Sequence, residues 1–424
     1  MRPRILRGKT TPRSPCMIFR HIAALALAAA VLTASAEDFD LVNVTLVDGT
    51  GAGPRAGVTV SVRDGRIAAI SGDGPAAAAD IRQINLKERF LLPGLIDSHA
   101  HIESPAAALR ALQSGVTTAR VLGDNFLQAV YTRDLVKRGR VPGPELLVSP
   151  GHIRPKPGTA FFMVYPEFAD AIDGELRGPD RIAAATRALI AKGADVVKVG
   201  ASERAGLAHT DPRKPELTED EIRAAVTEAA NNGLHVAAHA HAREGCAAAV
   251  RAGVRSIEHG TWCDDDTLAE MKRRGTYFVP TLAAMSPLAD PKGNAADEVA
   301  LRLRTQAMMG PLRAAVASAH AMGIPIAAST DGSYADDDIG GLRVAHDIAL
   351  LREFGGLSPL ESITAATLNG ARVAGIESRT GTIRVGLEAD LVACDGDPLV
   401  DGRTLFEPRL VVSDGRILIE GLGL

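Results

Sequence analysis

Between residues 94 and 376 the sequence alternates short apolar runs with amphipathic segments, and this alternation constrains the fold more than any other feature. The apolar runs predict buried strands, and the longer segments between them predict helices. Eight such units in one uninterrupted run favour an α/β fold closed into a (β/α)8 TIM barrel, while a doubly wound open sheet is the alternative. The predicted strands are 95–101, 115–121, 145–149, 194–199, 234–239, 256–259, 277–281 and 324–331.

Strand-like segments also lie at both ends of the chain, outside this run. They are 39–46, 58–62 and 67–70 at one end, and 391–394, 410–412 and 417–419 at the other. An Asp-Gly pair predicts a hairpin turn at each end, at Asp64-Gly65 and Asp414-Gly415. Neither end has enough strands for a stable sheet of its own. We therefore expect one composite β-sandwich domain made of residues 37–93 and 377–424, which encloses the barrel of 94–376.

Residues 1–36 have the composition of a cleaved secretory signal peptide. Basic residues precede a short apolar run at 22–32, and Ala34-Ser35-Ala36 fits a small-x-small cleavage site. A membrane anchor is the alternative, but the run is shorter than the ~20 residues that a membrane-spanning helix needs. We therefore expect a secreted or periplasmic protein, with either Met1 or Met17 as the true start.

The composition of the remaining chain excludes some partners. The formal charge of −4 includes six positive charges from residues 1–36, so the remainder carries −10 and has no basic patch for nucleic acid or an anionic membrane. Three cysteines remain, Cys246, Cys263 and Cys394, and no two have Cys-x-x-Cys spacing. An odd number without such spacing predicts buried thiols and argues against a disulfide scaffold.

Residues that commonly bind metals fall at the ends of the predicted strands. His99 and His101 lie two apart on the first strand, so their side chains point to the same face. The other candidates end the fourth, fifth, sixth and eighth strands: Lys198, His239, His259 and Asp331. The carboxyl ends of the strands form the face on which barrel enzymes keep their active sites. Four histidines and an aspartate suit zinc, with nitrogen and carboxylate ligands and room for water.

Taken as an ordered set, these residues resemble the amidohydrolase superfamily. The segment 93–101, Pro-Gly-Leu-Ile-Asp-Ser-His-Ala-His, is close to that family's first-strand signature, and the resemblance runs from about Asp38 to the C-terminus. Within the superfamily, the chain is most similar to the branch of imidazolonepropionases and metal-dependent dipeptidases. The resemblance also implies the composite β-sandwich. It implies one metal on His99, His101 and Asp331, and a second on His239 and His259.

Lys198 decides between one metal and two. In the resembling family, a lysine at this strand end reacts with CO2 to give a carbamate, which is anionic and bridges two metal ions. By that resemblance, carboxylated Lys198 joins two Zn2+ ions per chain. The alternative is an ordinary buried lysine paired with Asp195 or Glu203. The site would then be mononuclear, as in imidazolonepropionases, which lack this lysine.

Two further histidines are candidates for catalytic contacts with the substrate. His241 shares a strand face with His239 and could compete as a ligand, but the family pattern favours the first histidine of such a pair. We therefore expect His241 beside the metals or on the substrate. His152 follows the third strand and either lines the pocket or is structural. Either histidine could stabilise an oxyanion. The remaining histidines are expected to be structural or on the surface: His209, His235, His320 and His346.

These parts predict a metal-dependent hydrolase that cleaves a C–N bond. A metal lowers the pKa of bound water from 15.7 to about 7, and the resulting hydroxide attacks an amide carbonyl. Asp331 takes up the proton and passes it to the leaving nitrogen. The expected substrate is a small-molecule amide, a dipeptide or an N-acyl amino acid, and the expected assembly is a homo-oligomer. Alternatives are a cyclic amide or other non-peptide amide or carbamate, or a binding protein that kept the fold without the chemistry.

Two predicted loops depart from the family pattern. Residues 120–124, Arg-Val-Leu-Gly-Asp, stand where many relatives have Arg-Asp-x-Gly-Gly, and residues 150–158 replace a Gly-rich loop. Both loops would shape the substrate pocket, so the substrate does not follow from the resemblance. Four loop residues could bind a substrate carboxylate, although solvated side chains are the favoured interpretation: Arg154, Lys156, Tyr165 and Arg204.

Overall fold

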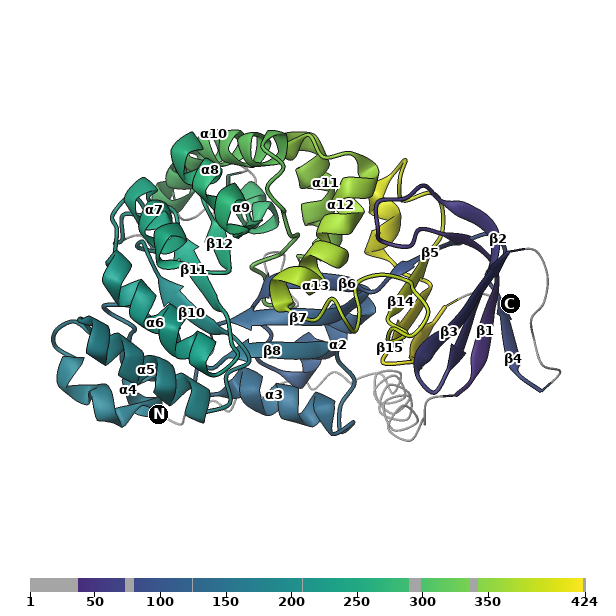
Figure 1. Ribbon diagram of the computed structural model, residues 1–424, viewed down its shortest axis with the longest axis horizontal. Coiled ribbons are helices and arrows are strands. Elements are labelled where there is room, and N and C mark those ends of the chain that lie inside the picture. Colours follow the sequence, from purple (N-terminus) through teal and green to yellow (C-terminus); the bar gives the residue numbers. More distant parts are fainter. Residues whose placement is uncertain are drawn as a thin grey trace, which may run out of the picture.

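The computed structural model describes residues 37–72, 80–123, 125–207, 209–289, 299–335 and 342–421. The predicted signal peptide, residues 1–36, lies outside these ranges, as does Asp124 of the predicted loop at 120–124. The described part has a β-sheet region on the right of Figure 1 and a larger region of parallel strands and helices on the left. Within these ranges, no helix combines the length and the apolar character that crossing a membrane requires.

One eight-stranded sheet combines strands from both ends of the chain, seen as purple and yellow arrows in Figure 1. Its order is β16-β15-β14-β5-β1-β2-β3, with β4 on β1. The two ends meet where β14 pairs antiparallel with β5, with Val392 opposite Leu92. This pairing makes the sheet continuous. The predicted joining of the two chain ends is therefore present, but within the described residues it takes the form of one sheet and not of a β-sandwich. The strands are β1 (Phe39–Leu46), β2 (Arg55–Arg63), β3 (Arg66–Gly72), β4 (Arg82–Asn85), β5 (Phe90–Pro93), β14 (Leu391–Cys394), β15 (Leu410–Ser413) and β16 (Arg416–Glu420).

The two predicted Asp-Gly hairpins pack against each other. Asp64 and Gly65 have φ of 48° and 73°, and Asp414 and Gly415 have φ of 50° and 70°. Positive φ at both central residues is what a type I′ turn needs, and it explains the choice of Asp-Gly. A Cβ on Gly415 would lie 2.1 Å from the Cα of Gly65, so no larger residue fits between the turns. The ends of the chain are thus tied together at this contact as well as through β5 and β14.

The rest of the strands form two parallel sheets. One contains β6 (Leu95–Ala100), β7 (Val116–Leu122) and β8 (Glu145–Ser149). The other contains β9 (His152–Ile153), β10 (Val197–Gly200), β11 (Val236–Ala240), β12 (Ser256–His259) and β13 (Tyr277–Val279). The α-helices are α2 (Pro105–Gln113), α3 (Gln128–Lys137), α4 (Thr159–Val164), α5 (Pro179–Ala191), α6 (Glu219–Asn231), α7 (Arg243–Ala252), α8 (Asp265–Arg274), α9 (Leu282–Ala289), α10 (Val299–Ala321), α11 (Val344–Gly355), α12 (Pro359–Ala365) and α13 (Leu368–Ala374). The alternation of strands and helices was therefore predicted correctly. The domain boundaries at 93/94 and 376/377 stay a prediction.

The eighth predicted strand, 324–331, does not form a strand, and this corrects the sequence analysis. Pro325 has no N–H to donate, and Asp331 has φ of 51°, outside the β region. The segment nevertheless bonds on both sides. Phe278 N of β13 donates to Pro325 O (3.0 Å), and Ser98 N of β6 donates to Ala328 O (3.1 Å). Within the described ranges the structure thus has two parallel sheets and no closed ring of eight strands.

A disulfide joins Cys246 to Cys263, which the sequence analysis judged improbable. The first turn of α7 and the loop after β12 belong to successive strand–helix units, so the two Cα atoms lie 5.6 Å apart. That distance is in the usual range for a disulfide. The prediction of free thiols was wrong for this pair because a spacing of 17 residues does not reveal that the two loops are neighbours. Cys394 is a free, buried thiol, as predicted.

Candidate metal and active site

A cavity of about 680 Å3 opens at the carboxyl ends of the parallel strands. All eight residues that the sequence analysis selected line it: His99, His101, His152, Lys198, His239, His241, His259 and Asp331. His209, His235, His320 and His346 are absent from its walls. The side chains of the cavity floor come from strands as far apart in the sequence as β6 and β12.

Asp331 lies against His99 of β6 and against His101, which directly follows that strand. Its Oδ1 is 2.9 Å from His101 Nε2 and 3.3 Å from His99 Nε2. The backbone holds this arrangement, since Asp331 N donates to His99 O (2.7 Å) and His101 N donates to Gly332 O (2.8 Å). Burial raises the pKa of Asp331, but the histidines around it lower the pKa by a larger amount. The pKa is therefore well below the usual value. The carboxylate is therefore ionised.

Asp97 binds the backbone on both sides of this contact, at His99 and at Thr330, and it was not predicted from the sequence. Its carboxylate accepts hydrogen bonds from Thr330 N (3.0 Å), Thr330 Oγ1 (2.6 Å) and Tyr334 Oη (2.8 Å), and from His99 N (3.1 Å). Burial raises the pKa of Asp97 to about 6, while these bonds oppose the rise. Asp97 shares the strand face of His99 and His101, and this period of two is the signal that could have found it.

Three histidines form a second cluster beside the first. The ring centroid of His259 lies 4.6 Å from that of His239 and 4.7 Å from that of His241. The ligand atoms of these three residues lie within 4.8 Å of one another, as do those of His99, His259 and Asp331. The ring of His241 therefore lies about as close to the ring of His259 as the ring of His239 does. Its assignment as a neighbour of the metals instead of a ligand stays a prediction.

The Nδ1 atoms of two of these histidines are bound to threonine hydroxyls. Thr261 Oγ1 lies 2.8 Å from His241 Nδ1, and Thr281 Oγ1 lies 2.7 Å from His259 Nδ1. His259 has φ of 70°, so the chain leaves strand geometry there and turns the imidazole toward the cavity. Burial lowers the pKa of His239 and His259 well below the usual value, and that of His241 to about 3. The three rings are therefore neutral and can offer a lone pair.

Lys198 is buried beside His99, with its Nζ 3.4 Å from His99 Nε2. The two carboxylates considered as partners are engaged elsewhere: Asp195 pairs with Arg133 (2.6 Å), and Glu203 pairs with Lys214 (2.9 Å). Burial lowers the pKa of Lys198 to about 8, against the attraction of Glu258 and Asp331. An appreciable fraction of the amine is thus neutral near neutral pH, and only a neutral amine reacts with CO2.

Glu258 and Arg120 form a buried ion pair under the site that the sequence analysis did not identify. Arg120 donates to Ser98 O (2.7 Å) and to Glu258 Oε1 (2.9 Å), and Glu258 Oε2 lies 3.0 Å from His99 Nδ1. Burial alone would raise the pKa of Glu258, but Arg120 and His99 bring it below the usual range. The carboxylate therefore lies beside Nδ1 of His99, and Nε2 of the same ring faces Asp331 and Lys198. Carboxylates near the far nitrogen are common around metal-binding histidines.

The donor set fits a divalent cation. Neutral imidazoles and an ionised carboxylate are the forms in which these groups bind metals. They converge from both clusters on one cavity and share His259. Nitrogen and carboxylate donors together suit zinc and its neighbours in the first transition series, whereas magnesium and calcium favour oxygen donors.

The loop after β8 is less solvated than the sequence analysis expected. Arg154 is buried and pairs with Glu216 (2.6 Å), which compensates the charge and explains why it can leave water. Tyr165 is buried and donates to Pro150 O (2.9 Å). Lys156 is exposed, as expected, while Arg204 is exposed on the wall of the cavity. Of the four candidates for a substrate carboxylate, Arg204 alone combines exposure with a position on the cavity wall.

Two features define the class of protein. One is a parallel α/β region with histidines and an aspartate at its strand ends, and the other is a β-sheet built from both ends of the chain. Residues 90–418 match the model of the amidohydrolase family, and the chain belongs to that family. The resemblance inferred from the sequence is thereby confirmed.

Two relatives show the extent of the similarity. The chain is 31% identical over 288 residues to ochratoxinase of Aspergillus niger, a match that covers 67% of this chain and 57% of that protein. A solved structure of a Xaa-Pro dipeptidase with methionine bound in its active site is 26% identical. It superposes with a TM-score of 0.79 over 90% of this chain and 99% of that one.

Proposed function

We propose that this protein is a metal-dependent hydrolase of amide C–N bonds. The observation that carries the proposal is the convergence of neutral histidines and ionised Asp331 on one cavity, in forms ready to bind a divalent cation. Family membership supports it, since amidohydrolases generally depend on a metal. We propose two Zn2+ ions, one held by His99, His101 and Asp331 and the other by His239 and His259. Carboxylated Lys198 would lie between them.

The residues of the chain have distinct roles in this reaction. A cation held at the site supplies Lewis acidity toward a carbonyl oxygen and lowers the pKa of water to about 7. Asp331, ionised and 2.9 Å from His101, accepts the proton of the attacking water and returns it to the leaving nitrogen. His152 lines the same cavity, with its ring 6.0 Å from that of His239, and is placed to donate to the carbonyl oxygen.

We also propose that the two parallel sheets and residues 324–332 act as one closed (β/α)8 barrel. Two further observations support closure on both sides of this segment. Ala327 N donates to Phe278 O of β13 (2.9 Å), and Ala100 of β6 forms a parallel bridge to Gly332. On the other side, Asp195 N donates to Val148 O of β8 (2.8 Å), just before β10 begins. A crystal structure in which residues 324–332 leave either β6 or β13 would contradict the proposal.

The proposed substrates are dipeptides and N-acyl amino acids. Arg204 offers a positive charge at the cavity wall, and apolar side chains such as Phe161 and Met285 line the same space. The names of the relatives, a Xaa-Pro dipeptidase and an ochratoxinase, support amide substrates. Because the match covers little more than half of ochratoxinase, the activity does not transfer from it. A cyclic amide or carbamate is the second candidate, and it would follow if the site held a single metal.

The test is a panel of dipeptides, N-acyl amino acids, cyclic amides and carbamates incubated with the purified chain. We expect release of a free amine from an acyclic amide that bears a carboxylate, and faster turnover than of its methyl ester. Hydrolysis confined to cyclic amides would favour the second candidate. The absence of turnover with every class, by protein that retains its metal, would contradict the proposal.

We further propose that the protein is exported and that the mature chain begins near Glu37. The basic, apolar and small-x-small pattern of residues 1–36 carries this proposal. The Cys246–Cys263 disulfide supports it, because such bonds persist mainly in oxidising compartments. N-terminal sequencing of protein from the native host should give Glu37 as the first residue. Recovery of chains that begin at Met1 or Met17 from the cytoplasm would refute export.

A further inference from the structure

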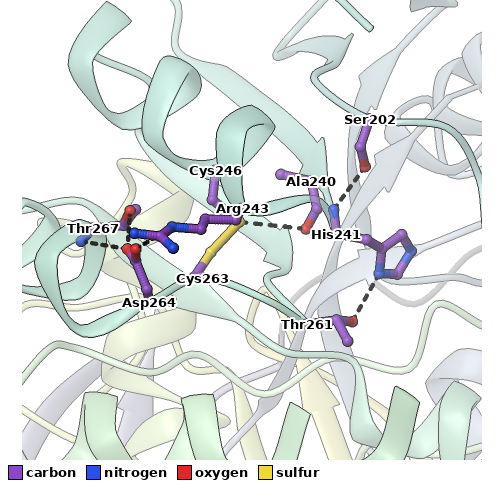
Figure 2. The surroundings of a disulfide bond; sticks show 9 residues. All are labelled: Ser202, Ala240, His241, Arg243, Cys246, Thr261, Cys263, Asp264 and Thr267. Atoms are coloured by element: carbon purple, nitrogen blue, oxygen red, sulfur yellow. Dashed lines mark hydrogen bonds and ion pairs between the residues drawn. A yellow bond between two sulfur atoms is a disulfide. The ribbon is translucent and has the colours of Figure 1, made fainter. Parts of the chain in front are cut away.

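The Cys246–Cys263 disulfide lies near His241, one of the three clustered histidines, as Figure 2 shows. Cys246 is in the first two turns of α7, which directly follows His241 and Ala242. Cys263 follows the short loop Gly260-Thr261-Trp262, which begins after His259 at the end of β12. Each half of the disulfide is therefore within five residues of a histidine of the cluster. The bond ties together the two loops that carry His241 and Thr261.

The loop between β12 and Cys263 holds His241 at two points. Thr261 Oγ1 lies 2.8 Å from His241 Nδ1, and Trp262 N donates to His241 O (3.0 Å). On the opposite side, His241 N donates to Ser202 Oγ (2.7 Å), so the residue is fixed between two loops (Figure 2). Of these two loops, the one with Ser202 bonds to the backbone of His241 and the one with Thr261 bonds to the imidazole. With Nδ1–H donated to the hydroxyl, the lone pair of Nε2 is left for the cavity.

Both contacts depend on where the loop lies. Thr261 and Cys263 are separated by one residue, so a shift of the backbone at Cys263 moves the hydroxyl directly. The disulfide fixes that end of the loop to α7, whose own start is covalently continuous with His241. A small closed circuit results, which runs from His241 through α7 to Cys246, across the sulfur atoms to Cys263, and back through Thr261 to the imidazole.

We propose that Thr261 is a positioning residue for His241, and that the Cys246–Cys263 disulfide keeps Thr261 in contact with Nδ1 so that Nε2 faces the metal site. The inference rests on the proposed metal-dependent function. It gives His241 a direct part in holding the cation, instead of a place beside it. Hydrogen bonds of this kind at the far nitrogen of a histidine typically change metal affinity by about 10- to 100-fold.

A second cavity gives small reductants access to the disulfide at Cys263. It has a volume of about 540 Å3 and is lined by Thr261, Trp262, Cys263 and Arg243, among others. Because Cys263 lies on the wall of this cavity, we expect a water-soluble phosphine to reduce the disulfide there. The phosphine supplies two electrons and takes an oxygen atom from water, and the two protons of that water end on the two thiols. Reduction should then loosen the loop without changing any residue that faces the active-site cavity.

The first test compares Thr261→Val with Thr261→Ser. Valine keeps the shape of threonine but cannot hydrogen-bond, whereas serine keeps the hydroxyl. Zinc affinity of the metal-free variants, measured by competition with a chromophoric chelator, should fall about 10- to 100-fold in Thr261→Val and recover in Thr261→Ser. Thr276→Val is the matched control, because Thr276 is buried just before β13, at the other end of the strand from the site. Its zinc affinity should equal that of the wild type.

The second test addresses the disulfide. Phosphine-treated wild type and the variant Cys246→Ala/Cys263→Ala should both lose zinc affinity, and Cys394→Ala should not. The same treatment should cause no further loss in Thr261→Val, because the contact that the disulfide maintains is already absent. Full affinity in Thr261→Val or in the reduced wild type would overturn the inference alone. A wild type that binds no metal would overturn both the inference and the proposed function.

Discussion

Replacement of Asp331 by Asn should lower turnover by at least about 10²-fold, the low end of what general acid–base catalysis contributes. Asn has the size of Asp but cannot accept the proton of the attacking water, and it is a weaker ligand than a carboxylate. The fold should survive. Asp331 has φ of 51°, and Asn tolerates the left-handed region as well as Asp does. The measurement is kcat together with the metal content of the variant.

The competing account of Asp331 is that it merely shapes the turn after Thr330. Under that account Asn is a good substitute, and Asp331→Asn would keep near-wild-type turnover with normal metal content. That result would remove the catalytic role and weaken the proposed function as a whole. Asp134→Asn, in the exposed part of α3, is the matched control and should leave turnover unchanged.

Replacement of Lys198 should remove most activity and lower the metal content from near two per chain toward one. The lysine is buried beside His99, and its two nearest alternative carboxylate partners in the sequence are paired with other residues. Without the carbamate, the anionic group between the two cations is lost. The metal content, measured by mass spectrometry, and the turnover should therefore fall together in Lys198→Ala.

Two variants of Lys198 separate a bridging role from a packing role. Lys198→Ala leaves space, so short carboxylic acids should partly restore its activity. Lys198→Met fills that space with an apolar chain of similar length and should not respond to the same acids. A wild-type ratio near one metal per chain, with unaltered activity in Lys198→Ala, would refute the bridge and favour the mononuclear alternative.

The positions of the proposed ligands along the chain could be predicted from the sequence because they depend on local rules. His99 and His101 share a face through the period of two along a strand. Lys198, His239 and His259 stand at or next to the ends of apolar runs, and parallel strands bring such ends to one edge. The structure places all of them on one cavity.

The supports of the site could not be predicted in this way because they depend on contacts between distant segments. Arg120 and Glu258 are 138 residues apart, and each looks like an isolated charge inside an apolar run. Such charges inside predicted strands are nevertheless a usable signal, since a buried charge needs a partner. The positive φ of His259 and Asp331 is equally invisible in the residue pattern, because neither is a glycine.

Two errors of the sequence analysis have the same origin. The eighth segment contains a run of apolar residues that predicts a strand, but Pro325 and the conformation of Asp331 limit it to isolated bonds with β6 and β13. The disulfide was missed because loop proximity in an α/β fold depends on how successive units pack. In both cases the neighbours in space, and not the local sequence, decide the outcome.

The most direct test of the central claim is to remove the metal and restore it. Protein treated with a chelator and then dialysed should lose all turnover of its best substrate from the panel, while its far-ultraviolet circular dichroism remains that of a folded chain. Addition of Zn2+ should restore turnover in proportion to the metal bound, up to about two ions per chain. Full turnover by protein shown to contain no metal would contradict the account.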